Sequence, residues 1–399
     1  MNKHRFKISI LLVSTLFISA CATNTNTSSV SNTSSAITTE DSSQTSVDEI
    51  VIDQPIMKLE TQGDVIINEN ECYERVRESN NTYYFQVLNR QISYLYPTVR
   101  QYKMDLHDGN ISLIKERDPN NNERVWDFLE FNGVFYESVI VPREDNAYGV
   151  IYADGNEIWS APLYGIPSAP LFAIDQGHLL FATSGPGDID MRSTVGRINS
   201  DQTITTLWQS GGDSGFTHFK FPTFTNDDLC KLVFQSTLNG KKVIVLVNSE
   251  GYETVEFDKD VIRLQPLNDK IFIANRKYEQ PDIGETFVED ASLAENEYHL
   301  LDLTTKEIVP IESPYDEIGN KNVGAGAQDS FLFIHYDDNG ATWKAKLKDN
   351  QLTIEKLPDI EAGIDYYFRL NDKTALVNVI VDYANNDWSK IKFYLVNME

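Results

Sequence analysis

The chain has 399 residues, and its 60 acidic and 34 basic side chains give a formal net charge of −26. Such an acidic surface disfavours nucleic acid and bare anionic lipid as partners, because both are negatively charged. A cationic ligand or divalent ions would be compatible with it, although a solvated acidic surface is the simpler interpretation. Besides Cys21, only Cys72 and Cys230 are present, so no disulfide framework is implied and we expect two separate thiols.

The N-terminal residues 1–20 predict a secretory signal rather than a part of the fold. A basic start precedes an apolar run of eleven residues, 8–18, which is too short to span about 30 Å of hydrocarbon as a permanent helix. The run ends in ISAC, which resembles the lipobox of bacterial lipoproteins. The resemblance implies that Cys21 carries the lipid and that the peptide before it is removed. An ordinary cleaved signal with a chance cysteine is the alternative.

The next segment, residues 21–48, consists almost entirely of serine, threonine, asparagine and other small or polar residues. It offers almost nothing to bury, so it cannot offset its ordering entropy, and we predict a flexible tether. Apolar and aromatic residues recur from residue 49 to the C-terminus. Residues 49–399 are therefore the predicted globular part, attached to the membrane outside the cytoplasm.

A hairpin-like unit recurs along the globular part, with two alternating apolar strands around a short turn. Its turns are separated by 45 to 54 residues, and the first two contain Asp-Gly, the signal for a type I′ hairpin. The six units are YKMDLHDGNISLI (102–114), GVIYADGNEIWSA (149–161), VGRINSDQTITTLW (195–208), VIVLVNSEGYETVEF (243–257), YHLLDLTTKEIVPI (298–311) and WKAKLKDNQLTIEKL (343–357).

A second series of turns alternates with these units, and a strongly apolar stretch follows each turn. The turns are Asn89-Arg90, Asn132-Gly133, Gln176-Gly177, Asp227-Asp228, Asn268-Asp269, Gln328-Asp329 and Asn371-Asp372. After the first of them comes ISYLYP (92–97), which we predict to be a strand. Each period then holds four short antiparallel strands, which is one blade of a β-propeller. A pair of β-sandwiches is the alternative, but a sandwich has no reason to repeat at this spacing.

The pattern predicts an all-β, seven-bladed β-propeller of four-stranded antiparallel blades. The last unit lacks its outer strand, so we expect a strand from the N-terminal end of the domain to complete it and remove an open edge. The candidates are Ile50–Ile52 and Gly63–Ile67.

Some of the hairpins also resemble known propeller families. Leu301–Ile308 and Ala153–Trp159 are similar to the hairpins of quinoprotein-like and prolyl-oligopeptidase-type propellers. That resemblance implies the architecture and no active site, and we expect no hydrolase domain after the last blade. Asp338–Trp343 resembles the Asp-box of sialidases, which is a structural turn in that family, with Tyr336 where serine is usual.

The predicted binding residues lie in two loops that the propeller topology places on one face, where binding residues usually sit. The first loop, 184–193, is rich in glycine, and the second, 210–220, joins the third and fourth blades. Together they supply the ligand-binding candidates Asp188, Asp190, Arg192, Asp213, His218 and Lys220. The alternating aspartates lack the full pattern of a calcium loop, so we predict no metal site. The acidic insertion 276–297 is either a contact loop or a mobile one.

The second loop contains Gly212-Asp213-Ser214-Gly215, which resembles the nucleophile loop of trypsin-like proteases. Phe216 stands where that family has a second glycine, and no histidine has the flanking sequence of its catalytic base. A serine nucleophile needs a base within hydrogen-bond reach and an acid that orients the base. We therefore interpret Ser214 as a turn residue.

No zinc-spaced Cys/His pair, phosphate loop or dinucleotide motif is present, so the sequence predicts no cofactor. The favoured function is non-enzymatic binding of an envelope protein, peptide or glycan by a monomeric, lipid-anchored propeller. An extracytoplasmic enzyme acting on sugars or peptides, through residues such as Asp188 and His218, is the first alternative. A scaffold in an envelope complex is the second.

Overall fold

The structure is a computed structural model that describes residues 50–399, with several gaps. The gaps are residues 92–95, 145, 164–168, 184–192, 212–213, 218–219, 228–229, 268, 277–295, 313–322, 328–329, 336–340, 349–350, 358–359, 361–363, 372 and 382–387. The predicted signal, the lipidation site Cys21 and the tether lie outside the described residues, as does the Asp-box turn at 338–340.

The described residues form seven four-stranded antiparallel sheets. The first holds β2 (Glu71–Ser79), β3 (Thr82–Asn89), β4 (Thr98–Asp105) and β5 (Ile111–Glu116), and the second holds β6 (Arg124–Phe131), β7 (Val134–Pro142), β8 (Ala147–Ala153) and β9 (Asn156–Leu163). The third holds β10 (Leu171–Asp175), β11 (His178–Thr183), β12 (Thr194–Ile198) and β13 (Ile204–Gln209), and the fourth holds β14 (Lys220–Asp227), β15 (Cys230–Leu238), β16 (Lys241–Val247) and β17 (Tyr252–Glu256). The fifth holds β18 (Val261–Leu267), β19 (Lys270–Arg276), β20 (Asn296–Asp302) and β21 (Ile308–Ile311), and the sixth holds β22 (Val323–Ala327), β23 (Ser330–His335), β24 (Ala341–Lys348) and β25 (Gln351–Lys356). The last holds β26 (Ile364–Arg369), β27 (Thr374–Ile380), β28 (Ile391–Asn397) and β1 (Ile56–Leu59).

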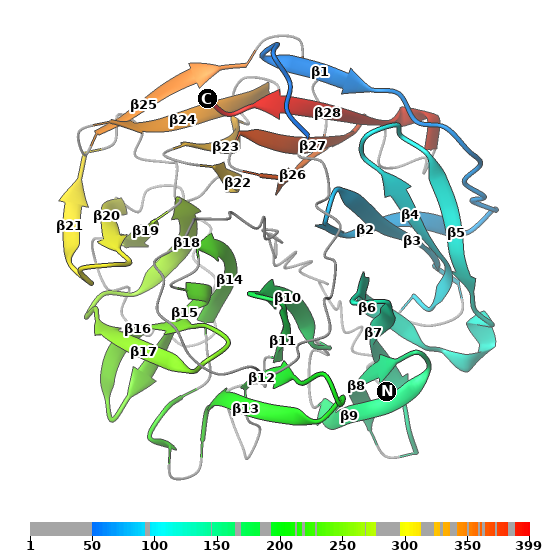
Figure 1. Cartoon of the computed structure of the whole chain (residues 1–399), viewed down its shortest axis with the longest axis horizontal. Coiled ribbons are helices and arrows are strands. Elements are labelled where there is room, and N and C mark those ends of the chain that lie inside the picture. Colours follow the sequence, from blue (N-terminus) through cyan, green and yellow to red (C-terminus); the bar gives the residue numbers. More distant parts are fainter. Residues whose placement is uncertain are drawn as a thin grey trace, which may run out of the picture.

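The sheets are arranged in a ring as a β-propeller, with the first strand of each sheet nearest the centre (Figure 1). All six predicted hairpins occur as the third and fourth strands of their sheets. The helices with described bounds are two short turns, η1 (Pro119–Asn121) and η6 (Trp388–Lys390). The all-β prediction is therefore confirmed.

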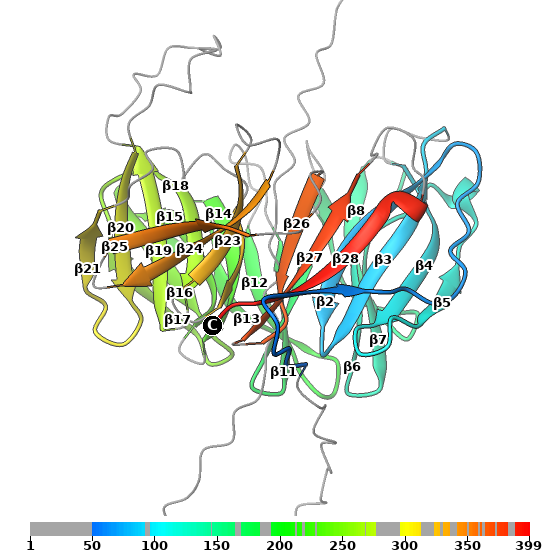
Figure 2. The same ribbon diagram turned by 90° about the horizontal axis from the view of Figure 1, so that it is seen from above.

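The ring has two different faces, and its strands run between them (Figure 2). Because successive strands are antiparallel, the first-to-second and third-to-fourth turns lie together, on what we call the turn face. The second-to-third connections and the connections between sheets lie on the opposite face, which we call the loop face.

The first sheet corrects one predicted turn. The structure places the turn between the first two strands at Asn80-Asn81, rather than at Asn89-Arg90, and Asn89 ends β3. Both asparagines have positive φ, 50° and 58°, as a type I′ hairpin requires, and asparagine tolerates this conformation better than most residues. In the predicted strand 92–97, the described residues Tyr96 and Pro97 are irregular, because Tyr96 has φ 51° and Pro97 has no N–H to donate.

The last sheet is completed from the N-terminal side, as expected, but by a different segment. β1 pairs antiparallel with β28, in the register Ile56 opposite Val396. Neither predicted stretch forms a strand: Ile50 and Ile52 are buried in irregular backbone, and 63–67 is also irregular. Figure 2 shows β1 (blue) lying across the outside of β28 (red).

Residues 50–68, which we call the N-terminal strap, also hold the first sheet. The backbone of Gln62 donates to Gly109 O at 2.8 Å, and Ile111 N donates to Gln62 O at 2.7 Å, at the hairpin turn between β4 and β5. Farther along, the Arg100 guanidinium donates to Ile66 O at 3.0 Å. The strap therefore joins the two ends of the chain across the point where the ring closes.

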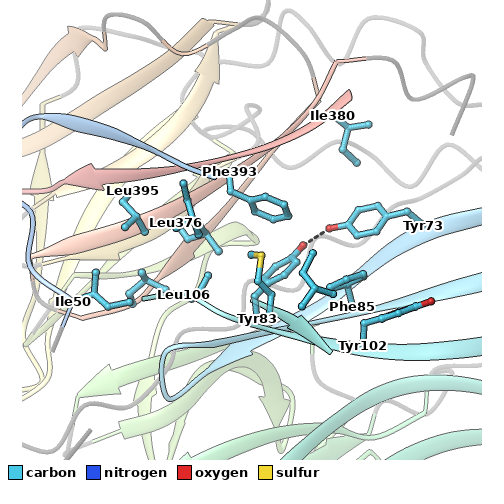
Figure 3. Packing of buried hydrophobic residues seen from close by; sticks show 14 of the residues in the cluster. Ile50, Tyr73, Tyr83, Phe85, Tyr102, Leu106, Leu376, Ile380, Phe393 and Leu395 are labelled. Carbon is cyan, nitrogen blue, oxygen red and sulfur yellow. Dashed lines mark hydrogen bonds between the residues drawn. The ribbon is translucent and has the colours of Figure 1, made fainter. Parts of the chain in front are cut away.

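The core at this closure is aromatic with a small polar centre (Figure 3). The hydroxyls of Tyr73 and Tyr83 contact one another, and each donates to Asn378 Oδ1 of β27, at 2.9 and 3.1 Å. Phe85 stacks on Trp388 with ring centroids 5.0 Å apart. Because buried polar groups are costly unless paired, this arrangement favours one alignment of the first and last sheets.

A buried ion pair joins the inner strands of the first three sheets. Arg77 donates to Asp127 Oδ2 at 3.0 Å and to Phe172 O at 3.2 Å, and Phe172 N donates to the same carboxylate oxygen at 2.7 Å. The strand register shifts just before Arg77 and just before Asp127. Bulges redirect side chains, and here both residues reach the neighbouring sheets.

Candidate functional site

The predicted binding residues lie almost entirely outside the described part of the chain. Asp188, Asp190, Arg192, Asp213 and His218 are not among the described residues. Lys220 begins β14, where its backbone lies opposite Gln235 of β15. Whether these six residues form one site therefore stays a prediction.

The loop around Ser214 is described well enough to define its serine. Ser214 Oγ donates to Gly211 O at 2.8 Å and accepts from Phe216 N at 3.2 Å, so it completes its own turn. Asn239 N, in the turn between β15 and β16, donates to Gly215 O at 3.0 Å. The loop therefore packs against a second-to-third connection, on the loop face. The hydroxyl of Ser214 is held by its own backbone.

The cysteines lie in different sheets. Cys72 is in β2 and Cys230 is in β15, and Cys72 forms no disulfide. Burial raises the pKa of the Cys72 thiol, although the neighbouring Arg90 acts in the opposite direction. A thiol held in its neutral form is a poor nucleophile. We therefore assign Cys72 a structural role.

The described residues instead show an arginine–tyrosine stack on the loop face of the second sheet. Arg143 follows β7 in the connection to β8, and its guanidinium lies 4.4 Å from the centre of the Tyr148 ring. It also donates to Glu157 Oε2 at 2.9 Å. The Arg143 side chain retains 40% of its exposure. The pair is therefore oriented and still accessible.

A second stack lies at the inner edge of the same sheet. The Arg124 guanidinium is 5.3 Å from the centre of the Trp126 ring and pairs with Glu74 of β2. Trp126 is partly buried, and like Ala147 it packs against Ile140 and Ala169, next to the connection that carries Arg143. Both stacks therefore flank the connection between β7 and β8. We call Arg124, Trp126, Arg143 and Tyr148 the stacked surface.

An ionic network lies at the junction of the first and second sheets. Glu137 of β7 is buried, and it accepts from Lys115 and from Arg117 at 2.6 Å each. Arg117 also donates to Glu123 at 2.6 Å. Burial alone would raise the pKa of Glu137, but the two cations hold it below its ordinary value. Glu137 therefore stays charged and fixes the second sheet against the first.

Tyr152 connects this network with the stacked surface. Its pKa is raised by burial and by the charges of Glu123 and Glu157, while Arg143 and Arg117 partly oppose that shift. Charged groups of both the ionic network and the Arg143–Glu157 pair thus shift the pKa of Tyr152.

The sequence contains no motif that marks the connection at 142–147 as a site. Arg124 and Trp126 lie in a strand, where alternating aromatic residues predict packing. The one sequence signal for the stack is the short spacing between Arg143 and Tyr148. That spacing alone does not distinguish a stack from a solvated pair.

A titratable cluster lies at the base of the insertion, between the fourth and fifth sheets. His299 of β20 meets the Phe257 ring edge-on at 5.5 Å between centroids, and Lys259 pairs with Glu297 beside it. Burial lowers the pKa of His299, and the charge of Lys259 lowers it further, while Glu297 and Asp258 oppose the shift.

This cluster predicts that mild acid destabilises the fold. Because the pKa of His299 is lower in the folded chain than the ordinary 6.5, the unfolded chain takes up the proton first. The contribution of neutral His299 to the free energy of unfolding is complete above pH 6.5. It is lost as the pH falls through the pKa that His299 has in the folded chain. Urea unfolding should therefore show that the free energy of unfolding falls more between pH 7.5 and pH 5 in the wild type than in His299→Gln. Equal losses would contradict this assignment.

In the described residues, no three His, Cys, Asp or Glu side chains are grouped closely enough to hold a metal ion. Nor does that part of the chain contain a helix long and apolar enough to cross a membrane.

No protein-family model matches the chain, and no curated protein matches it. Among solved structures, it is similar to prolyl endopeptidases (TM-score 0.48, 11% identity, 78% of this chain and 46% of that chain). It is also similar to a post-proline cleaving enzyme from Rickettsia typhi (TM-score 0.45, 9% identity, 78% and 50%) and to a chain of the mitotic checkpoint complex (0.45, 10%, 92% and 100%). The chain spans about half the length of these peptidases. At such low identity the similarity is one of fold alone.

Proposed function

We propose that this chain is an extracytoplasmic lipoprotein, anchored to the membrane through Cys21, whose propeller binds a protein, peptide or glycan ligand without transforming it. Two features support this. The signal-like segment ends in ISAC, and the tether that follows is almost entirely polar. Each of the seven sheets corresponds to one predicted blade, so we propose a seven-bladed propeller closed by β1.

The stacked surface is the observation that carries the binding function. Arginine, tryptophan and tyrosine are the residues enriched at the energetic centres of protein interfaces. Arg143 is already oriented by Tyr148 and Glu157, so a partner would not have to order its long side chain. Among the three ligand classes this composition favours a polypeptide.

Two further observations support binding over catalysis. The hydroxyl of Ser214 is used within its own turn. The buried pairs Arg77–Asp127 and Arg117–Glu137 join neighbouring sheets. These groups hold the scaffold together.

Photocrosslinking in intact cells tests the proposal. A benzoylphenylalanine placed at the exposed Glu144, beside the stacked surface, should form a discrete crosslinked product. The same residue at the exposed Glu250, in a turn between β16 and β17, should not. The double variant Arg143→Ala/Tyr148→Ala should reduce the yield from position 144 about tenfold, which corresponds to about 1.4 kcal/mol.

The matched control is Lys270→Ala, which removes a cation paired with Asp269 on the turn face. It should leave the yield unchanged. Equal yields from positions 144 and 250, or equal effects of the two substitutions, would contradict binding at the stacked surface. If the protein binds a glycan array saturably and the same double variant does not, the ligand is a glycan rather than a polypeptide.

A further inference from the structure

The path of the N-terminal strap determines where the tether leaves the propeller. Ile50 is 6% exposed, and its carbonyl accepts from Asn371 Nδ2 at 2.7 Å and from Thr374 Oγ1 at 3.0 Å. Two residues later, Ile52 O accepts from Asn397 Nδ2 at 3.1 Å. The start of the described chain is therefore fixed to the body.

These contacts lie on the turn face. Asn371 belongs to the turn between β26 and β27, and Thr374 begins β27. Asn397 ends β28, a third strand, which also finishes on this face. All three side chains donate to one short stretch of the strap backbone. The point where the tether leaves the body therefore cannot shift to the opposite face without breaking buried hydrogen bonds.

The stacked surface lies on the other face. Arg143 is in a second-to-third connection, and Arg124 begins β6, a first strand, which starts on the same face. The predicted tether of residues 21–48, as a flexible chain, has a root-mean-square length of about 30 Å. That length is comparable with the thickness of one domain. The exit point therefore biases which face lies nearer the lipid.

Charge adds to this bias. A body with a net charge of −26 is repelled by an anionic bilayer, so it gains nothing by lying flat on the lipid. Repulsion keeps the body at the end of its tether, with the attachment point towards the membrane.

We propose that the propeller is tethered by its turn face, so that its loop face points away from the membrane and meets ligands arriving from the medium. This orientation rests on the proposed anchoring through Cys21. It makes the stacked surface accessible to a partner that is not itself in the same membrane.

Energy transfer from single labels to the membrane tests the orientation. The full lipidated protein is purified in a Cys230→Ser background, because Cys72 is buried and should not react with a maleimide dye. One cysteine is then introduced at an exposed position on each face, Glu250→Cys or Thr305→Cys on the turn face and Glu144→Cys or Asn121→Cys on the loop face. The labelled proteins are bound to vesicles of phosphatidylcholine and anionic phosphatidylglycerol that carry a headgroup acceptor dye.

Both turn-face labels should transfer energy at least twofold more efficiently than both loop-face labels. Equal or reversed efficiencies, in protein that floats with the vesicles, would overturn the orientation while leaving the anchoring intact. Protein that does not float with the vesicles would overturn the anchoring, and the orientation with it. Flotation and energy transfer therefore separate the two failures.

Discussion

Replacing Arg77 by methionine should lower the free energy of unfolding by about 3–5 kcal/mol, because it leaves the Asp127 carboxylate buried without its cation. Arg77 and Asp127 are each 2% exposed, so water cannot replace the lost partner. The arginine also donates to Phe172 O, and the loss therefore affects three sheets. Urea unfolding monitored by tryptophan fluorescence measures the change.

The double variant Arg77→Met/Asp127→Leu is the control for this effect. Removing both charges leaves no buried ion without a partner, so stability should partly recover towards the wild type. A double variant less stable than Arg77→Met would show that the two residues act separately. A single variant as stable as the wild type would contradict the role of the ion pair.

Replacing Gly109 by alanine should release the N-terminal strap. Gly109 has φ +72°, and a Cβ at this position would lie 2.1 Å from Glu60 O, a backbone atom of the strap. Gly155 provides a matched control, because it follows Asp154 in the equivalent hairpin turn of the second sheet, with φ +83° and no atom within 4 Å of the place that a Cβ would take. Both alanines incur the left-handed backbone cost of about 1–2 kcal/mol.

In Gly109→Ala alone, the free energy of unfolding should fall by about 1–3 kcal/mol more, through strain or through displacement of the strap. Limited proteolysis should then cleave residues 50–68 faster in Gly109→Ala than in Gly155→Ala. Equal stability and equal cleavage in the two variants would show that the strap does not depend on this contact.

Much of the architecture could be predicted from periodicity, because each sheet repeats the same strand and turn chemistry. The hairpins at Asp108-Gly109 and Asp154-Gly155 combine an explicit turn signal with alternating strands. In the first sheet, the turn between the first two strands was placed wrongly because Asn80-Asn81 lacks glycine, and the apolar stretch 92–97 was a more conspicuous strand candidate. The completing strand β1 was placed a few residues away, because Ile50 and Ile52 are equally apolar and are buried without pairing.

The candidate site could be predicted far less well. The stacks Arg124–Trp126 and Arg143–Tyr148 depend on how a strand and a connection approach one another, and residue spacing does not encode that distance. The Arg77–Asp127 pair links residues from different sheets through two bulges, which no local pattern marks. Ser214 was predicted as a turn residue from its neighbours, and its hydrogen bonds confirm that role.

The most direct measurement is the mass of the N-terminal peptide of the protein purified from membranes. The expected result is a peptide that begins at Cys21 and carries a diacylglyceryl group. The Cys21→Ser variant should lack this group and should leave the membrane fraction. An unmodified mature N-terminus at any other residue, with the protein still in the membrane fraction, would contradict anchoring through Cys21.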